Sequence, residues 1–94
     1  MRKMIVCKKR TESDAGERLT LIYSVTIDEL TNASFDANVE SYGAGIAIEE
    51  RGEEVYIRHI TLHNSEISEL TSLLASNFVT PTTLLDVVED WLCR

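Results

Sequence analysis

The stretch between Arg18 and Asp28 alternates apolar with polar residues, and this pattern constrains the fold more than any other part of the chain. The apolar positions are Leu19, Leu21, Tyr23, Val25 and Ile27. Successive side chains of a strand point to opposite faces, so these residues would share one face. Only Ile22 interrupts the pattern. The stretch therefore predicts a half-buried β-strand over residues 17–28.

Two further segments have strand patterns on either side of it. Residues 2–9 alternate weakly, and Asp14 and Gly16 after them favour a turn. Residues 39–50 place one set of side chains opposite small residues, with a loop expected over residues 31–38. The first set is Tyr42, Ala44, Ile46 and Ile48, and the small residues opposite are Gly43, Gly45 and Ala47.

A fourth strand is predicted over residues 53–62, after a hairpin turn at Arg51 and Gly52. Its apolar residues change register, because Val55 and Ile57 fall on one face and Ile60 and Leu62 on the other. A bulge near Arg58 and His59 would return all four to one side, since one extra residue shifts the alternation. The alternative is that both faces are covered near that end.

Two helices follow, over residues 65–77 and 81–92. Asn64 or Ser65 can cap the first, while Thr80 would cap the second with Pro81 at its first position. In the second helix one contiguous apolar face would hold Leu84, Leu85, Val87, Val88, Trp91 and Leu92. Asp86, Glu89 and Asp90 fall together on the opposite face and are expected in water. Acids near a helix C-terminus oppose its dipole, so a cation, such as one from the first strand, would offset them.

The pattern as a whole predicts one α+β domain over residues 1–94. Its four-stranded antiparallel sheet would follow the order of the chain (ββββαα), with a C-terminal helical hairpin packed on one face. The expected core is Leu19, Leu21, Tyr23, Val25, Tyr42, Ile46, Ile48, Ile57, Ile60, Leu70, Leu74, Leu84, Val88 and Trp91.

Composition narrows the cellular setting. No apolar run in the 94 residues approaches the length of ~20 residues that a membrane span needs. The start, MRKMIVCKKR, lacks the apolar centre of a signal peptide. We therefore expect a cytoplasmic protein without membrane contact, in which Cys7 and Cys93 stay reduced. Their spacing matches neither a metal site nor a CxxC redox motif.

The charge distribution is strongly asymmetric. Net charge is −7, yet five of the nine basic residues lie in the first ten positions, and residues 11–94 carry four basic and sixteen acidic residues, a net of −12. An acidic chain is unsuited to phosphate contacts, so no nucleic-acid partner is expected. The basic segment could serve an anionic partner. Alternatively, its lysines could protect an edge strand from pairing with another sheet.

No residue set indicates catalysis, a cofactor or a metal. His59 and His63 have the i, i+4 spacing of a zinc pair, but the segment is predicted to pass from strand to helix, so their rings need not converge. The pair Gly43 and Gly45 lacks the third glycine of a dinucleotide fingerprint and fits a bulge or a close backbone approach instead. No serine stands in a GxSxG elbow.

Three stretches resemble a known family. They are YGAGIAI from Tyr42, ITLHNSEISEL from Ile60, and VTPTTLLDVVEDWL from Val79. Together they are similar to a family of short uncharacterised proteins from Firmicutes, especially clostridia, classified as a domain of unknown function. The resemblance covers about residues 17–92. It implies a small stand-alone bacterial cytoplasmic protein, and it carries no site residues.

Two kinds of function fit these observations, with an enzyme a distant third. The first is a protein-interaction or regulatory module, which could form a weak homodimer through the outer face of the second and third strands. Its surface would hold Ile22, Gly43 and Gly45, beside Thr20, Ser24, Thr26 and Ala47. The second is a small-ligand-binding domain, with a pocket between sheet and helices near Tyr23, Tyr42 and His59.

Overall fold

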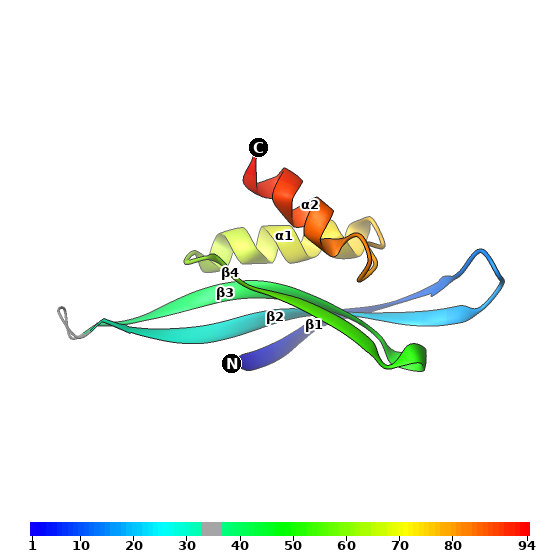
Figure 1. The fold of residues 1–94 in the computed structure, drawn as a ribbon, viewed down its shortest axis with the longest axis horizontal. Coiled ribbons are helices and arrows are strands. Elements are labelled where there is room, and N and C mark those ends of the chain that lie inside the picture. Colours follow the sequence, from blue (N-terminus) through cyan, green and yellow to red (C-terminus); the bar gives the residue numbers. More distant parts are fainter. Residues whose placement is uncertain (33–36) are drawn as a thin grey trace.

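The computed structural model describes the backbone of residues 1–32 and 37–94 and the side chains of residues 1–30 and 39–94. Four antiparallel strands are followed by two helices that lie on one face of the sheet (Figure 1), which confirms the predicted α+β fold. The elements are β1 (Arg2–Glu12), β2 (Arg18–Asn32), β3 (Ala37–Ile48), the 3-10 turn η1 (Glu49–Arg51), β4 (Glu53–Thr61), α1 (Asn64–Ser76) and α2 (Leu84–Leu92).

The strands lie side by side in chain order, β1-β2-β3-β4, as predicted. β2 and β3 pair as far as Asn32 and Ala37, so both run further than expected into the segment that was predicted as a loop. The centre of that predicted loop, residues 33–36, lies outside the described residues. β1 also continues beyond residue 9, to Glu12.

Two irregularities bend the edge strands. The pairing of β1 with β2 shifts between Ile5 and Cys7, and the pairing of β3 with β4 shifts at the level of Gly43. The second shift leaves His59 with a φ of 59°, in the left-handed region that bulges use and that few non-glycine residues adopt. The position of the predicted bulge is therefore confirmed. Its predicted size is wrong, because Gly43 lies opposite residues 58–60, which is two extra residues instead of one, and Thr61 rather than Leu62 pairs with Tyr42.

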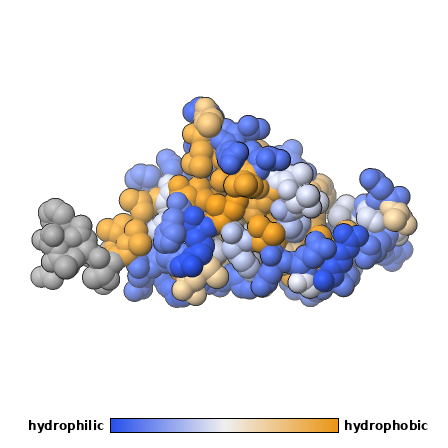
Figure 2. All heavy atoms as spheres, in the orientation of Figure 1, coloured by the Kyte–Doolittle hydropathy of each residue, from blue (hydrophilic) through white to orange (hydrophobic). Residues whose placement is uncertain are grey.

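The core lies between the inner face of the sheet and the two helices. Hydrophobic residues gather between sheet and helices in Figure 2, while the right-hand end of the sheet is largely hydrophilic. All the predicted core residues are buried except three, Tyr42, Ile57 and Ile60, which are partly buried and pack against the core. Among the described residues, four buried hydrophobic residues of this core were not predicted: Ala44, Ile67, Ala75 and Val79.

The two helix starts differ from the predictions. α1 begins at Asn64 itself, with His63 as its N-cap residue. α2 begins only at Leu84, because the Thr83 N–H donates to the Thr80 carbonyl at 3.2 Å and closes a turn instead of a first helical turn. Thr83, not Thr80, is therefore the N-cap residue, and Pro81 is buried before the helix.

The buried face of α2 is narrower than its sequence predicts. Leu84, Val88 and Trp91 are buried, whereas Leu85 and Leu92 are 55% and 53% exposed. The stripe is narrow because α2 packs mainly against α1 at the edge of the molecule (Figure 1). The acids Asp86, Glu89 and Asp90 are exposed, as predicted.

The cation at the end of α2 comes from the chain terminus. The Arg94 guanidinium lies 3.9 Å from the centre of the Trp91 ring and donates to the Trp91 carbonyl at 2.9 Å. A cation at this position interacts favourably with the negative end of the helix dipole. In the parts of the chain that are described, no ion pair joins the α2 acids to β1. The cation beside the helix end is thus Arg94, and the first strand, named above as an example of a source, forms no ion pair with these acids within the described residues.

Among the described residues, no helix is long and apolar enough to cross a membrane.

Candidate functional site: the first strand and the outer sheet face

Two glycines of β3, Gly43 and Gly45, lie on the face of the sheet that points away from the helices. A Cβ on Gly45 would come within 2.1 Å of the Tyr56 ring, and one on Gly43 would come within 2.2 Å of the Ile57 carbonyl oxygen. Both contacts are shorter than real Cβ atoms allow. The glycines therefore let β4 and its tyrosine lie close against β3.

A side-chain contact spans this outer face from one edge strand to the other. Lys3 of β1 donates from Nζ to the hydroxyl of Tyr56 of β4 at 2.9 Å, and its ammonium lies 5.2 Å from the ring centre. The hydrogen bond to Tyr56 raises the pKa of Lys3. Ser24 and Thr26 of the intervening strand β2 are buried. The small residues predicted as an open dimer surface are thus largely covered by the chain itself.

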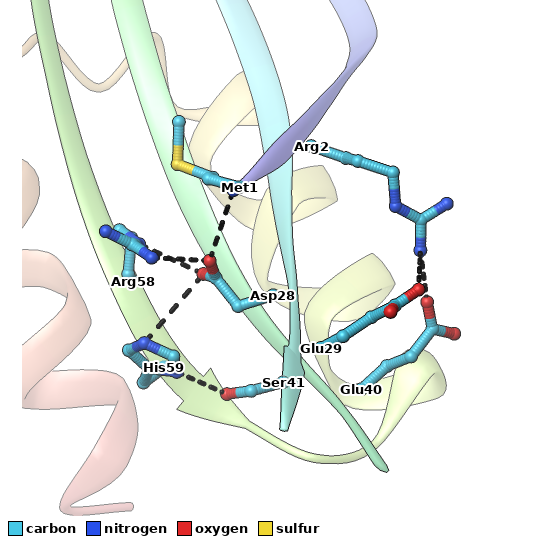
Figure 3. A network of polar contacts seen from close by, with 8 residues as sticks. All are labelled: Met1, Arg2, Asp28, Glu29, Glu40, Ser41, Arg58 and His59. Atoms are coloured by element: carbon cyan, nitrogen blue, oxygen red, sulfur yellow. Dashed lines mark hydrogen bonds and ion pairs between the residues drawn. The ribbon is translucent and has the colours of Figure 1, made fainter. Parts of the chain in front are cut away.

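A second contact on the same face holds a buried carboxylate (Figure 3). Arg58 donates to both oxygens of Asp28, from Nε at 3.0 Å and from Nη2 at 2.5 Å. The N-terminal ammonium of Met1 lies 3.8 Å from the same carboxylate. The hydrogen bonds from Arg58 hold the pKa of Asp28 below its usual range. Bidentate pairing of this kind fixes the geometry of both partners.

His59 joins this network from the bulge of β4. Its Nδ1 lies 3.0 Å from Ser41 Oγ, and its Nε2 lies 3.9 Å from Asp28 Oδ2. Serine, histidine and aspartate thus meet, as in a hydrolase triad. However, Ser41 is only 2% exposed, the His–Asp distance exceeds a hydrogen bond, and Arg58 already occupies the carboxylate. The cluster fixes the bulge and presents no accessible nucleophile.

Sequence reasoning missed this cluster, because its members are far apart in the chain. Asp28 and Ser41 are cross-strand partners, and the bulge adds His59 beside them. A sequence signal existed in the predicted bulge at Arg58 and His59. Only the register between the strands shows that a buried carboxylate lies opposite it.

The predicted pocket residues are not brought together. Tyr23 is fully buried, and its hydroxyl donates to the Val79 carbonyl at 2.9 Å. Burial raises the pKa of Tyr23 to about 12. Tyr42 lies on the helix-facing side with its hydroxyl 3.3 Å from Glu40, whereas His59 reaches Ser41 on the outer face. The geometry therefore gives no support to a ligand pocket between these three residues.

A groove of about 600 Å³ lies elsewhere, where the β1–β2 hairpin approaches η1. Its walls carry both signs of charge, including Arg10, Arg18 and Glu50. Glu50 accepts hydrogen bonds from the Thr20 N–H at 2.6 Å and the Thr20 hydroxyl at 2.7 Å. These bonds lower the pKa of Glu50 and tie η1 to β2. The groove is open to solvent, and its Glu50 carboxylate is already hydrogen-bonded to Thr20.

The histidines and cysteines remain apart. His63 lies at the start of α1, and Cys7 and Cys93 are both free thiols. Within residues 1–32 and 37–94, no three His, Cys, Asp or Glu side chains are grouped so that they could hold a metal ion.

The free edge of β1 is the most unusual surface of the molecule. β1 pairs with β2 along one side only, and its apolar residues Met4, Ile5 and Val6 are 55%, 54% and 46% exposed. Further along the strand, Lys8 and Arg10 lie on the outer face and Lys9 on the inner face. An eleven-residue edge with apolar and then basic side chains is thus open to a partner.

A family model described as "Family of unknown function (DUF6514)" matches residues 2–94. The chain belongs to this family. No curated protein and no solved structure matches the chain. The match includes β1 and α2, so the exposed first strand is part of the DUF6514 unit and not an addition to it.

Proposed function

We propose that this DUF6514 protein is a small protein-interaction module without catalytic activity, and that it binds its partner along the free edge of β1. The observation that carries the proposal is the exposure of Met4, Ile5 and Val6 on an unpaired edge strand. Strand edges of this kind present backbone N–H and C=O groups that can pair with another chain.

The state of the polar clusters favours binding over catalysis. Arg58 donates two hydrogen bonds to Asp28, and His59 contacts the hydroxyl of the buried Ser41. The Tyr23 hydroxyl donates to the Val79 carbonyl. Groups that are satisfied within the fold stabilise it and leave little reactivity for a substrate. The β1 edge, in contrast, exposes the apolar side chains of Met4, Ile5 and Val6 to solvent.

The homodimer predicted from the sequence remains a second candidate. Gly43 and Gly45 are buried under β4 and Tyr56, so another protomer cannot approach these two residues closely. Ile22 is still partly exposed on the outer face, and Ile5 of β1 shares that face. An apolar contact around these two isoleucines would support weak self-association.

Site-specific crosslinking in the source cell tests the proposal. A photoreactive residue replaces Val6 on the β1 edge, and a matched variant carries it at Leu85, which is comparably exposed on α2. We expect discrete adducts with another protein from position 6 and weak or diffuse labelling from position 85. Equal adducts from both positions, or none from position 6, would contradict binding through the β1 edge.

A further inference from the structure

We infer that the occupant of the β1 edge is an acidic, extended protein segment that pairs with β1 as a fifth strand of the sheet. This inference rests on the proposed function and names the chemistry of the partner. It follows from three features of β1: its free backbone edge, the position of its bulge, and three cations, Lys8, Lys9 and Arg10, that form no ion pair within the described residues.

The backbone of β1 favours pairing over its second half. The strand is the last in the sheet on its side, so every second residue directs its N–H and C=O away from β2. Its register with β2 shifts between Ile5 and Cys7, and such an irregularity interrupts pairing on both sides. Regular strand from Cys7 to Glu12 remains for an added segment.

The cations of this half lie on both faces of the sheet. Lys8 and Arg10 pair with Ile22 and Thr20 on the outer face, whereas Lys9 pairs with Leu21 on the inner face. The side chains of an added strand also alternate between the faces. Consecutive acidic residues would therefore each meet a cation on one face or the other.

These three cations differ from the other two in β1. Arg2 forms ion pairs with Glu40 and Glu29, and Lys3 is bound to Tyr56. No ion pair is found for Lys8, Lys9 or Arg10 within the portion of the chain that the structure describes. Lys9 lies 6.0 Å from the ring centre of Phe78 instead.

The same lysines repel a basic strand, and this decides which partners can dock. Edge lysines prevent pairing between like sheets, but an acidic segment converts that repulsion into attraction. The exposed Met4, Ile5 and Val6 beyond the bulge favour a segment whose acidic run adjoins a few apolar residues. A long nucleic acid is a poorer occupant, because the rest of the chain, residues 11–94, carries a net charge of −12.

Peptide titration of the isotopically labelled full chain tests this inference. The probe is an end-blocked peptide with five Glu residues followed by Val-Ile-Val. One control replaces every Glu with Lys, and another keeps the acidic sequence but is N-methylated at alternate residues so that it cannot pair as a strand. We expect amide shifts and slowed hydrogen exchange in β1 with the acidic peptide, and at least tenfold weaker binding of both controls.

Charge reversal provides a second comparison. Lys9→Glu should weaken binding of the acidic peptide at least fivefold, whereas Arg94→Glu, the same charge change at the far end of the chain, should leave it within twofold. Unchanged amide spectra away from the substituted residue confirm that both variants are folded. Equal loss in both variants would mean that only overall charge matters, and it would overturn the inference.

Other outcomes also separate the two proposals. Equal binding of the N-methylated peptide, or tighter binding of a fifteen-nucleotide oligothymidylate, would overturn strand addition. If the acidic peptide failed to bind while crosslinks from position 6 persisted in cells, the interaction module would stand and the acidic partner would be wrong. If both failed, neither proposal would survive.

Discussion

Lys3 and Tyr56 belong to opposite edges of the sheet, yet the lysine Nζ donates to the tyrosine hydroxyl at 2.9 Å across the two central strands. The contact is possible because the residues beneath it are small, with Gly45 directly under the ring. It ties β1 to β4 independently of the backbone ladder. The part of the outer face over Gly45 is therefore covered by side chains of the protein itself, while Ile22 on this face and the edge of β1 stay accessible.

The two outer-face glycines should differ in their tolerance of a methyl group. Gly45→Ala meets the Tyr56 ring, which can swing outward, so we expect a loss of about 1–3 kcal/mol in the free energy of unfolding. Gly43→Ala meets the backbone carbonyl of Ile57, which cannot move without breaking the bulge, so its loss should be larger. Urea unfolding measures both.

A double-mutant cycle provides the control for this prediction. In a Tyr56→Ala background, the ring that Gly45→Ala strikes is absent, and the cost of the added methyl should fall by at least half. The cost of Gly43→Ala should change little. If both costs fell equally, the ring would not be the cause of the clash.

Trp91 should contribute far more to stability than a neighbouring apolar residue of the same helix. It is buried against the core, so Trp91→Ala should lower the free energy of unfolding by about 3–5 kcal/mol. Leu85→Ala removes an exposed side chain and should stay within about 0.5 kcal/mol. Chemical denaturation followed by circular dichroism distinguishes them. Similar losses would show that α2 packs through its other face.

The Asp28–Arg58 pair should make stability depend on pH in the acid range. The pKa of Asp28 is lower in the folded than in the unfolded chain, so the pair stabilises the fold above the ordinary value of 3.8 and this contribution is lost as the pH falls below it. We expect Asp28→Asn to be less stable than the parent at pH 7. The difference should shrink between roughly pH 5 and pH 2. A gap of constant size across that range would exclude this linkage.

Self-association should be weak and should depend on Ile22. Sedimentation velocity at several concentrations is expected to show a monomer–dimer equilibrium near a hundred micromolar, on the order of the affinity that a small apolar contact supplies. Ile22→Glu should return the protein to monomer, because a carboxylate would be desolvated in the contact. A dimer that survives this substitution would use another surface.

The fold should need no metal ion. His59 is held by Ser41, and His63 is placed apart from it at the start of α1. Incubation with EDTA is therefore expected to leave the melting temperature unchanged. A decrease of ten degrees or more would reveal a structural metal.

The sheet and its core could be predicted because their signal is local. Alternation in residues 19–27 identifies the buried face of β2, and β3 repeats it with Ala44 and Ile46. The bulge was also predictable, since the change of register between Ile57 and Ile60 is visible within one strand.

The remaining features depend on contacts between elements. Leu85 fits the apolar face of α2 by periodicity, but its exposure depends on how the helix sits against α1. The cluster of Asp28, Ser41 and His59 depends on the register of three strands. A pattern within one element cannot specify either of these.

The placement of both helices at the end of the chain has a consequence for synthesis on the ribosome. All four strands leave the exit tunnel before the residues that cover Leu21, Tyr23 and Ile46 have been translated. Until α1 and α2 emerge, the apolar inner face of the nascent sheet is exposed to solvent and to neighbouring nascent chains. A premature stop codon after β4 would make that state permanent, so such truncated products should be clients of chaperones and proteases.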